Sequence, residues 1–195
     1  MKILYLGNSI TFHGISHGIG WHGAWGMAAS AEEQDYVHCL NRMLAESGKY
    51  IGQKVEYKVS NIADFERKPD TYDFSQLAEL RDWEPDMLIL RICENTPEEK
   101  VCCFSEAYLQ LIQYFQRENL QIFSVGPFWQ HDRKEDGIRC AAEASGSVFV
   151  SLKHLHSTDY QAIGLFEHAG VASHPSDKGM QAIAETLFAA IQANG

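Results

Sequence analysis

Five short apolar runs alternate with segments of amphipathic helical pattern along this chain of 195 residues. The runs cover residues 3–6, 55–59, 87–92, 122–125 and 148–152. Short continuous apolar runs of this kind are typical of strands that are buried on both faces, although the second run is weaker and alternates with polar residues. Strands that alternate with helices predict an α/β fold in which a parallel sheet lies between helices.

Helix start signals stand between these runs. Ser30 and Glu33 form a capping box, which predicts a helix that ends near Gly48. Residues 96–99 open a second helix in which proline takes the first helical position, and Ser176 opens the last helix. Weaker helical patterns cover residues 74–82 and 132–145.

Composition narrows the class of protein. The length predicts a single domain over residues 1–195, and 45% hydrophobic residues are enough for one core. The formal net charge of −10 argues against binding to nucleic acid or to an anionic membrane surface, because both are bound through clustered Lys and Arg. No apolar window is long enough for a transmembrane helix, and the first residues lack the features of a signal peptide. Five cysteines without metal-site spacing predict reduced thiols and a cytoplasmic protein.

Residues 12–29 form an unusual segment that contains five glycines, Trp21 and Trp25. A loop of this length within a compact domain is usually functional or disordered. Because two tryptophans argue against disorder, we expect this loop to border a binding cleft.

The same loop carries His13, His17 and His22, which raises the hypothesis of a metal-dependent hydrolase. Their spacing would bring them together only on a helix, and a glycine-rich segment is a poor helix former. No metal and no cofactor are therefore expected.

Three polar residues stand at positions where chemistry is possible. Ser9 directly follows the first apolar run, so its hydroxyl would project into the crevice where parallel sheets bind ligands. His174 precedes a proline that holds it in an extended conformation, and a histidine is the base that a serine nucleophile needs. Asn95 follows the third run, where an amide can stabilise an oxyanion or simply cap a turn.

Taken together, these segments resemble the blocks of the SGNH/GDSL hydrolase superfamily, which includes GDSL-like lipases and acylhydrolases. Residues 7–9, Gly-Asn-Ser, resemble the Gly-Asp-Ser of its first block, and residues 94–95 resemble its third block, which ends in Asn. Residues 171–175 resemble its last block, Asp-x-x-His-Pro, except that Val171 replaces the acid. The matching blocks span residues 4–180 in the order of the family.

The resemblance implies a flavodoxin-like three-layer αβα sandwich with a five-stranded parallel sheet. It implies that Ser9 is the nucleophile and His174 the base, and that the Ser9 backbone N–H and the Asn95 side chain form parts of the oxyanion hole. Glu66 stands about where the family has a glycine whose N–H completes that hole. We expect Glu66 to turn its carboxylate away from Ser9, toward substrate hydroxyls or a basic partner such as Arg91, because a carboxylate would repel the oxyanion.

The missing acid leaves open which group orients the ring of His174. We expect a main-chain carbonyl near Val171 to accept the Nδ1 proton. The alternative is a carboxylate, for which Glu167 is the nearest upstream candidate and Asp159 a more distant one. Asp177 lies beyond the proline at the start of the last helix, where a capping role is expected.

The function predicted from these residues is a serine esterase or acylhydrolase that acts on a small-molecule acyl ester. Aromatic side chains beside polar groups often bind sugar rings, which makes an O-acetylated carbohydrate the first substrate hypothesis. The alternative is a weak or inactive carbohydrate-binding protein with the same fold, because the acid and the glycine are absent. The oligomeric state does not follow from the sequence. Substrate contacts are predicted for Asn8, Glu66, Trp21, Trp25, Glu94 and Trp129.

Overall fold

A computed structural model describes residues 1–48 and 54–194. One five-stranded sheet has the strand order β2-β1-β3-β4-β5, and every neighbouring pair is parallel. Each predicted strand is present with small shifts at its ends. The strands are β1 (Lys2–Gly7), β2 (Glu56–Asn61), β3 (Met87–Arg91), β4 (Gln121–Val125) and β5 (Val148–Val150).

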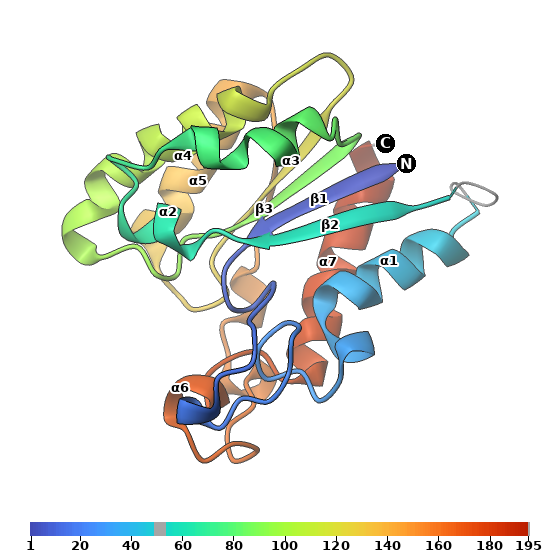
Figure 1. The fold of residues 1–195 in the computed structure, drawn as a ribbon, viewed down its shortest axis with the longest axis vertical. Coiled ribbons are helices and arrows are strands. Elements are labelled where there is room, and N and C mark those ends of the chain that lie inside the picture. The colour runs from blue at the N-terminus through green and yellow to red at the C-terminus, as the bar shows by residue number, and fades with distance from the viewer. Residues whose placement is uncertain (49–53, 195) are drawn as a thin grey trace.

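Helices cover both faces of this sheet, which confirms the three-layer αβα architecture (Figure 1). The α-helices are α1 (Tyr36–Glu46), α2 (Ala63–Arg67), α3 (Ala78–Asp82), α4 (Val101–Phe115), α5 (Asp132–Ser145), α6 (Ala169–Ala172) and α7 (Asp177–Asn194). Short 3₁₀ turns lie at His17–Ile19, Glu32–Gln34, Phe74–Leu77, Glu98–Lys100, Lys153–Leu155 and Thr158–Tyr160. In the described part of the chain, no helix combines the length and the apolarity that crossing a bilayer requires.

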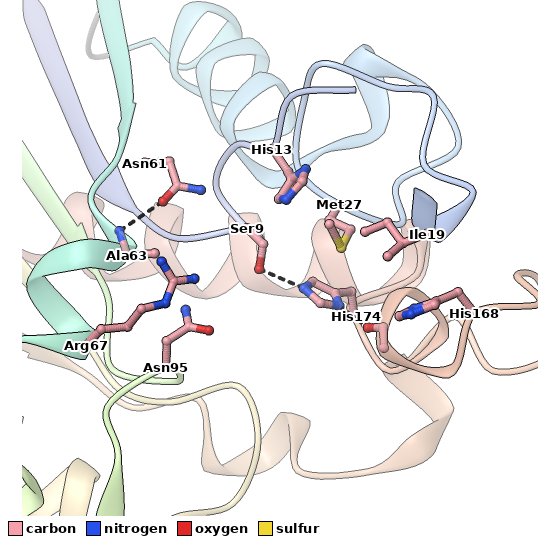
Figure 2. A pocket seen from close by; sticks show the side chains of 11 residues that line it. Ser9, His13, Ile19, Met27, Asn61, Ala63, Arg67, Asn95, His168 and His174 are labelled. Carbon is pink, nitrogen blue, oxygen red and sulfur yellow. Dashed lines mark hydrogen bonds between the residues drawn. The ribbon is translucent and has the colours of Figure 1, made fainter. Parts of the chain in front are cut away.

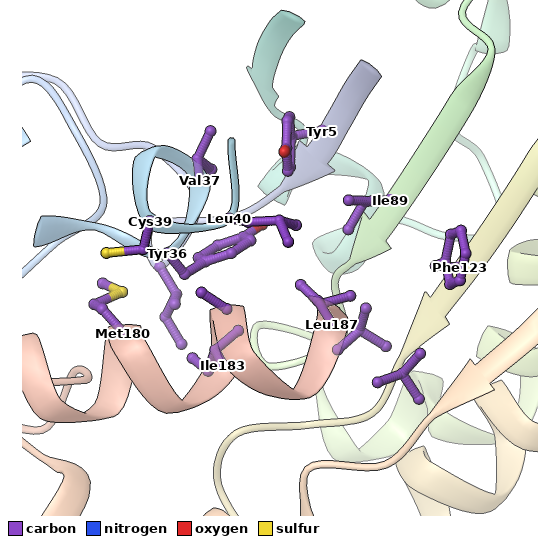
Figure 3. Packing of buried hydrophobic residues seen from close by; sticks show 14 of the residues in the cluster. Tyr5, Tyr36, Val37, Cys39, Leu40, Ile89, Phe123, Met180, Ile183 and Leu187 are labelled. Atoms are coloured by element: carbon purple, nitrogen blue, oxygen red, sulfur yellow. The ribbon is translucent and has the colours of Figure 1, made fainter. Parts of the chain in front are cut away.

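The alternation of side chains along the strands produces two cores. In β1, Ile3 and Tyr5 point toward the layer of α1 and α7, whereas Leu4 and Leu6 point toward the layer of α4 and α5. All four side chains are fully buried. The ring of Tyr5 packs edge-on against Tyr36 of α1 with 6.2 Å between ring centroids, in the first of these cores (Figure 3). Burial on both faces is the reason that the central strands have continuous apolar sequences.

The start of α1 differs from the capping-box prediction. Asp35, and not Ser30, is the N-cap, because its Oδ1 accepts a hydrogen bond from the backbone N–H of His38 at 2.8 Å. Ser30 instead donates to the carboxylate of Asp177, which ties the loop before α1 to the start of α7. The helix ends at Glu46, two residues before the predicted Gly48.

The second helix also begins later than predicted. Pro97 precedes the 3₁₀ turn Glu98–Lys100, and α4 starts only at Val101. By contrast, the weaker patterns over residues 74–82 and 132–145 do form helical structure, and the last helix starts directly after Ser176 as predicted.

The topology brings the ends of β1, β2 and β3 together. Gly7 at the end of β1 is in register with Asn61 of β2 on one side and with Arg91 of β3 on the other. The connection from β1 to β2 crosses one face of the sheet through α1, and the connection from β2 to β3 crosses the other face through α2 and α3. Open parallel sheets bind ligands at such a point, where the strand order reverses. A side chain at position 7 would lie 1.8 Å from Thr11 Oγ1, so the turn into Ser9 requires glycine.

The glycine-rich loop 12–29 folds back on itself and packs against the segment that precedes α7. His13 forms a bridge with Trp25, and Ser16 forms one with Trp21. Trp21 is buried in a small apolar cluster with residues that include Val171 of α6. This packing places the loop and α6 side by side at the carboxyl end of the sheet (Figure 1).

Candidate active site

A cavity of about 420 Å³ opens at the carboxyl end of β1, β2 and β3. Figure 2 shows Ser9 near its centre, with Asn95 and Arg67 on one side and His174 and His168 on the other. The glycine-rich loop contributes three lining residues, in agreement with the predicted cleft. The lining consists of Ser9, His13, Ile19, Met27, Asn61, Ala63, Arg67, Asn95, His168, Gly170 and His174.

Ser9 and His174 are 165 residues apart in the chain and form a hydrogen bond, with 2.7 Å between Oγ and Nε2. On the other side of the ring, Nδ1 lies 2.6 Å from the carbonyl oxygen of Gly170. A carbonyl can only accept, so Nδ1 carries the proton and Nε2 is left to accept the proton of the serine hydroxyl. The orienting group is thus a main-chain carbonyl near Val171, as expected, and it belongs to the preceding residue, Gly170. The carbonyl of Val171 accepts the backbone N–H of His174 at 3.0 Å.

Burial controls the protonation of His174. The loss of hydration, followed by repulsion from Arg91, lowers the pKa of the imidazole to about 4, although the hydrogen bond to the Gly170 carbonyl favours the charged form. The ring of Trp129 packs edge-on against the imidazole, with 5.4 Å between centroids. At neutral pH the imidazole is therefore uncharged and able to take up a proton.

The three candidate carboxylates take other positions. Asp177 accepts two hydrogen bonds from Ser30 at the start of α7. Glu167 lines a neighbouring cavity, and Asp159 is exposed on the 3₁₀ turn Thr158–Tyr160. Among the described residues, none of these carboxylates forms a hydrogen bond or ion pair with His174.

Two groups on the other side of Ser9 can stabilise negative charge. The carbonyl of Ser9 accepts the backbone N–H of Met27 at 2.8 Å, which fixes the turn that holds the serine. Within the described chain the backbone N–H of Ser9 itself has no hydrogen-bond acceptor. The amide of Asn95 lines the same cavity and uses one of its two N–H groups to bind Glu66.

Asn8 occupies the centre of a buried polar network behind this cavity. Its Nδ2 donates to Glu66 Oε1 at 2.8 Å and to Glu94 Oε2 at 2.6 Å, while its Oδ1 accepts from the backbone of Ile10 and from Arg91. An aspartate at position 8 would have no proton for either glutamate and would bring a third carboxylate into the network. The presence of two glutamates therefore explains why this chain has asparagine where the GDSL pattern has aspartate.

Glu66 points into this network and is fully buried. Its carboxylate accepts hydrogen bonds from the backbone N–H of Cys93 and from Asn95 Nδ2, each at 2.5 Å. Burial, followed by repulsion from Glu94, raises the pKa of Glu66 to about 7. Burial has the same effect on Glu94, but the Arg91 guanidinium and the hydrogen bonds from the Phe128 N–H and Asn8 together outweigh it and hold the pKa of Glu94 below its usual value.

These contacts correct the predicted substrate-binding roles of Asn8, Glu66 and Glu94. Asn8 is 1% exposed, Glu66 is fully buried, and the side chain of Glu94 is 4% exposed, so none of the three can touch a substrate in this conformation. Glu66 does turn away from Ser9, as expected, but toward Asn8 and Asn95 rather than toward substrate hydroxyls. Ala63, at the start of α2, lines the cavity near the position expected for Glu66.

The predicted tryptophans also lie outside this cavity. Trp21 is only 3% exposed, and it and Trp25 line a separate cavity of about 270 Å³. Trp129 packs on His174 and donates its Nε1–H to the carbonyl of Ser173, which fixes the loop that carries the histidine.

The sequence patterns missed several cavity residues. Asn61 ends β2 just as Asn95 follows β3, so its position at a strand end was an available signal. It donates to the carbonyl of Phe12 and accepts from the backbone N–H of Ala63, which joins the glycine-rich loop to α2. No comparable sequence signal marks Arg67, because its place at the cavity depends on the short helix α2, of which it is the last residue.

The loop histidines are split between different environments. His13 lines the cavity of Ser9, whereas His17 and His22 contact each other with 3.2 Å between their Nδ1 atoms. In the part of the chain that the structure covers, no group of three or more His, Cys, Asp or Glu side chains is arranged to hold a metal ion.

Several solved structures have a similar fold. The chain has the α/β fold of the SGNH/GDSL hydrolase superfamily, in agreement with its sequence motifs. Among the similar structures are a mutant of Axe2, an acetyl-xylooligosaccharide esterase from a Geobacillus species, and the acetyl xylan esterase AlAXEase. The Axe2 mutant has a TM-score of 0.64 at 19% identity over 97% of this chain and 93% of that one. AlAXEase has a TM-score of 0.59 at 16% identity over 98% and 100%.

A structure from Parabacteroides merdae described as a GDSL-like lipase is also similar, with a TM-score of 0.63 at 17% identity over 98% of this chain and 95% of that chain. At these identities the likeness concerns the fold. No family model and no curated protein sequence matches the chain.

Proposed function

We propose that this protein is a serine esterase that hydrolyses small acyl esters with Ser9 as nucleophile and His174 as general base. The observation that carries the proposal is the chain of two short contacts from Ser9 Oγ through the imidazole to the Gly170 carbonyl. A nucleophile, a base within hydrogen-bond distance and a group that orients the base form the arrangement that activates a serine.

In the proposed reaction, Ser9 Oγ attacks the ester carbonyl carbon and passes its proton to Nε2 of His174. The negative charge that develops on the carbonyl oxygen is stabilised by the Ser9 N–H and by the Asn95 amide. The imidazolium then returns the proton to the leaving alkoxide, and an acyl-serine remains. A water molecule, activated by the same imidazole, hydrolyses the acyl-serine and restores the hydroxyl of Ser9.

An O-acetylated carbohydrate is the proposed substrate. The support comes from the neighbours: Axe2 and AlAXEase are described as acetylxylan esterases, and each covers almost the whole chain. The tryptophans that first motivated this hypothesis lie outside the cavity of Ser9, so the proposal no longer depends on them. The single domain over residues 1–195 and the cytoplasmic location stay predictions.

The decisive experiment compares wild type with Ser9→Ala on p-nitrophenyl acetate and on acetylated xylo-oligosaccharides. We expect Ser9→Ala to lose turnover by about 10⁴-fold or more while it keeps the wild-type melting temperature. Ser75→Ala is a matched control, since this serine lies on the 3₁₀ turn Phe74–Leu77, away from the cavity. A serine-directed phosphonate should label Ser9 in the wild type.

Two outcomes would contradict the proposal. Equal activity of Ser9→Ala and wild type would remove Ser9 from the mechanism. A wild-type protein that shows no turnover yet binds acetylated sugars would favour the alternative of an inactive carbohydrate-binding protein.

A further inference from the structure

The ionisable side chains that line the cavity of Ser9 are all bases. They are His13, Arg67, His168 and His174, and none of the described residues that line the cavity is a carboxylate. Arg67 gives this lining a positive charge, whereas the chain as a whole has a formal net charge of −10. A cavity whose ionisable groups are all basic favours ligands that carry negative charge.

Arg67 is the permanent cation of this set. It is the last residue of α2, and its guanidinium extends into the cavity beside Asn95, on the side of Ser9 opposite to His174 (Figure 2). The guanidinium has five N–H donors in a planar fork, which matches the two oxygens of a carboxylate.

The contacts of Arg67 leave most of these donors available. Its one hydrogen bond within the described chain is from NH1 to Asp64 Oδ1, at 3.0 Å and one turn earlier in α2. The side chains of Arg67 and Asp64 are 55% and 84% exposed, and exposed pairs of this kind hold each other weakly. An anionic group entering the cavity can therefore bind the guanidinium without breaking a buried interaction.

Apart from Asp64, the neighbouring carboxylates do not cancel this charge at the cavity surface. Glu66 and Glu94 lie buried behind the cavity, where Asn8 donates a hydrogen bond to each and Arg91 forms an ion pair with Glu94. Glu167 lines the neighbouring cavity.

We propose that the substrate of this esterase carries a negatively charged group, such as a carboxylate, within a few atoms of the scissile ester, and that Arg67 binds this group. The inference rests on the proposed function and narrows its substrate class. The charge can belong to either of two sources, the acyl part of the ester or the alcohol part, and both present the same group to the guanidinium.

The test measures the ratio of kcat/KM for an anionic ester to kcat/KM for its neutral counterpart. In the acyl arm, mono-p-nitrophenyl succinate is compared with p-nitrophenyl acetate. In the alcohol arm, acetylated glucuronic acid is compared with acetylated glucose. In at least one arm, Arg67→Gln should lower this ratio about fivefold relative to wild type. Arg67→Lys, which keeps the charge, should retain part of the wild-type preference for the anionic ester.

Arg139→Gln is the matched control, because it removes the same charge from the exposed face of α5 and should leave both ratios unchanged. Raising the salt concentration should reduce the wild-type preference, since the ion pair is screened. Ratios that are unchanged by Arg67→Gln in both arms would overturn the inference.

The two proposals fail in different ways. Loss of turnover in Ser9→Ala on the neutral esters tests the esterase, whatever the charge preference. If the protein shows no esterase activity, calorimetry with succinate still compares anion binding by wild type and by Arg67→Gln. Equal affinities of the two proteins for succinate would overturn the role of Arg67.

Discussion

The carboxylate of Glu66 accepts a hydrogen bond from the side-chain amide of Asn95, with 2.5 Å between Oε2 and Nδ2. Glu66 is fully buried, so the acceptor that fixes the Asn95 amide is shielded from water. The carboxylate has no proton to offer when it is ionised, so the NH₂ group of the amide, and not its oxygen, faces Glu66. This contact links a residue behind the cavity to a group that faces Ser9.

Asn95→Ala should lower kcat by roughly 10²–10³-fold and change KM much less, because the amide acts on charge that develops in the transition state. Asn95→Asp should be at least as damaging, since it replaces a donor with a negative charge. Steady-state kinetics on p-nitrophenyl acetate measures both parameters. A change confined to KM would instead make Asn95 a residue that binds the substrate in its ground state.

Glu66→Gln should lower kcat about tenfold with little change in KM, because the glutamine can face Asn95 with either its oxygen or its NH₂ and no longer fixes the amide. If Glu66 acts through Asn95, the double variant with Asn95→Ala should be no slower than Asn95→Ala alone. Additive effects of the two substitutions on kcat would show that Glu66 acts by another route. Glu118→Gln, on an exposed carboxylate, is the control.

Stability should depend on pH through Glu66. Its pKa is raised from 4.5 to about 7 in the folded state, so the folded protein binds an extra proton between these pH values. The stabilisation that protonated Glu66 provides is complete below pH 4.5 and is lost as pH rises through 7. The free energy of unfolding should fall by up to about 3 kcal/mol for this reason. His174, whose pKa is lowered to about 4, contributes a change of the opposite sign over part of this range in both proteins. The decline should therefore appear in the difference between the free energies of urea unfolding of wild type and Glu66→Gln, measured from pH 4.5 to 8. Parallel curves for the two proteins would contradict the assignment.

The dependence of activity on pH should reflect His174. The base must be neutral to accept the proton of Ser9, and burial lowers its pKa to about 4. For a neutral ester, kcat/KM should therefore rise as pH increases through about 4 and should already be near its plateau at pH 5.5, where a solvated imidazole would still be mostly charged. An acid limb centred near 6.5 would show that the imidazole is hydrated during turnover.

The orienting group should be the Gly170 carbonyl. Glu167→Gln, Asp159→Asn and Asp177→Asn should each keep kcat/KM within about tenfold of wild type, whereas loss of a true triad acid costs about 10⁴-fold. Asp177→Asn also tests stability, because this carboxylate holds Ser30. A collapse of activity in one of the three variants, with an unchanged melting temperature, would identify the acid that orients His174.

Local patterns in the sequence were enough to find the sheet. The apolar runs of β1 and β3 reflect burial on both faces of a strand, and this burial imposes a pattern that is readable from neighbouring residues alone. Ser9 and Asn95 could be found for a related reason, since each lies shortly after the end of a strand, β1 or β3, that is visible in the sequence. The helix starts were predicted less accurately. Asp35, and not the predicted Ser30, is the N-cap of α1, and its carboxylate also accepts the backbone N–H of Gly26.

Only the tertiary structure decided which groups surround these residues. The carbonyl under His174 belongs to Gly170, and every residue has a carbonyl, so no residue type marks the one that turns toward the ring. Glu66 and Arg67 are adjacent in α2, yet one side chain is buried under Asn95 and the other enters the cavity. Their directions depend on how α2 packs beside β1 and β3, and contacts between segments so far apart in the chain leave no periodic signal in the sequence.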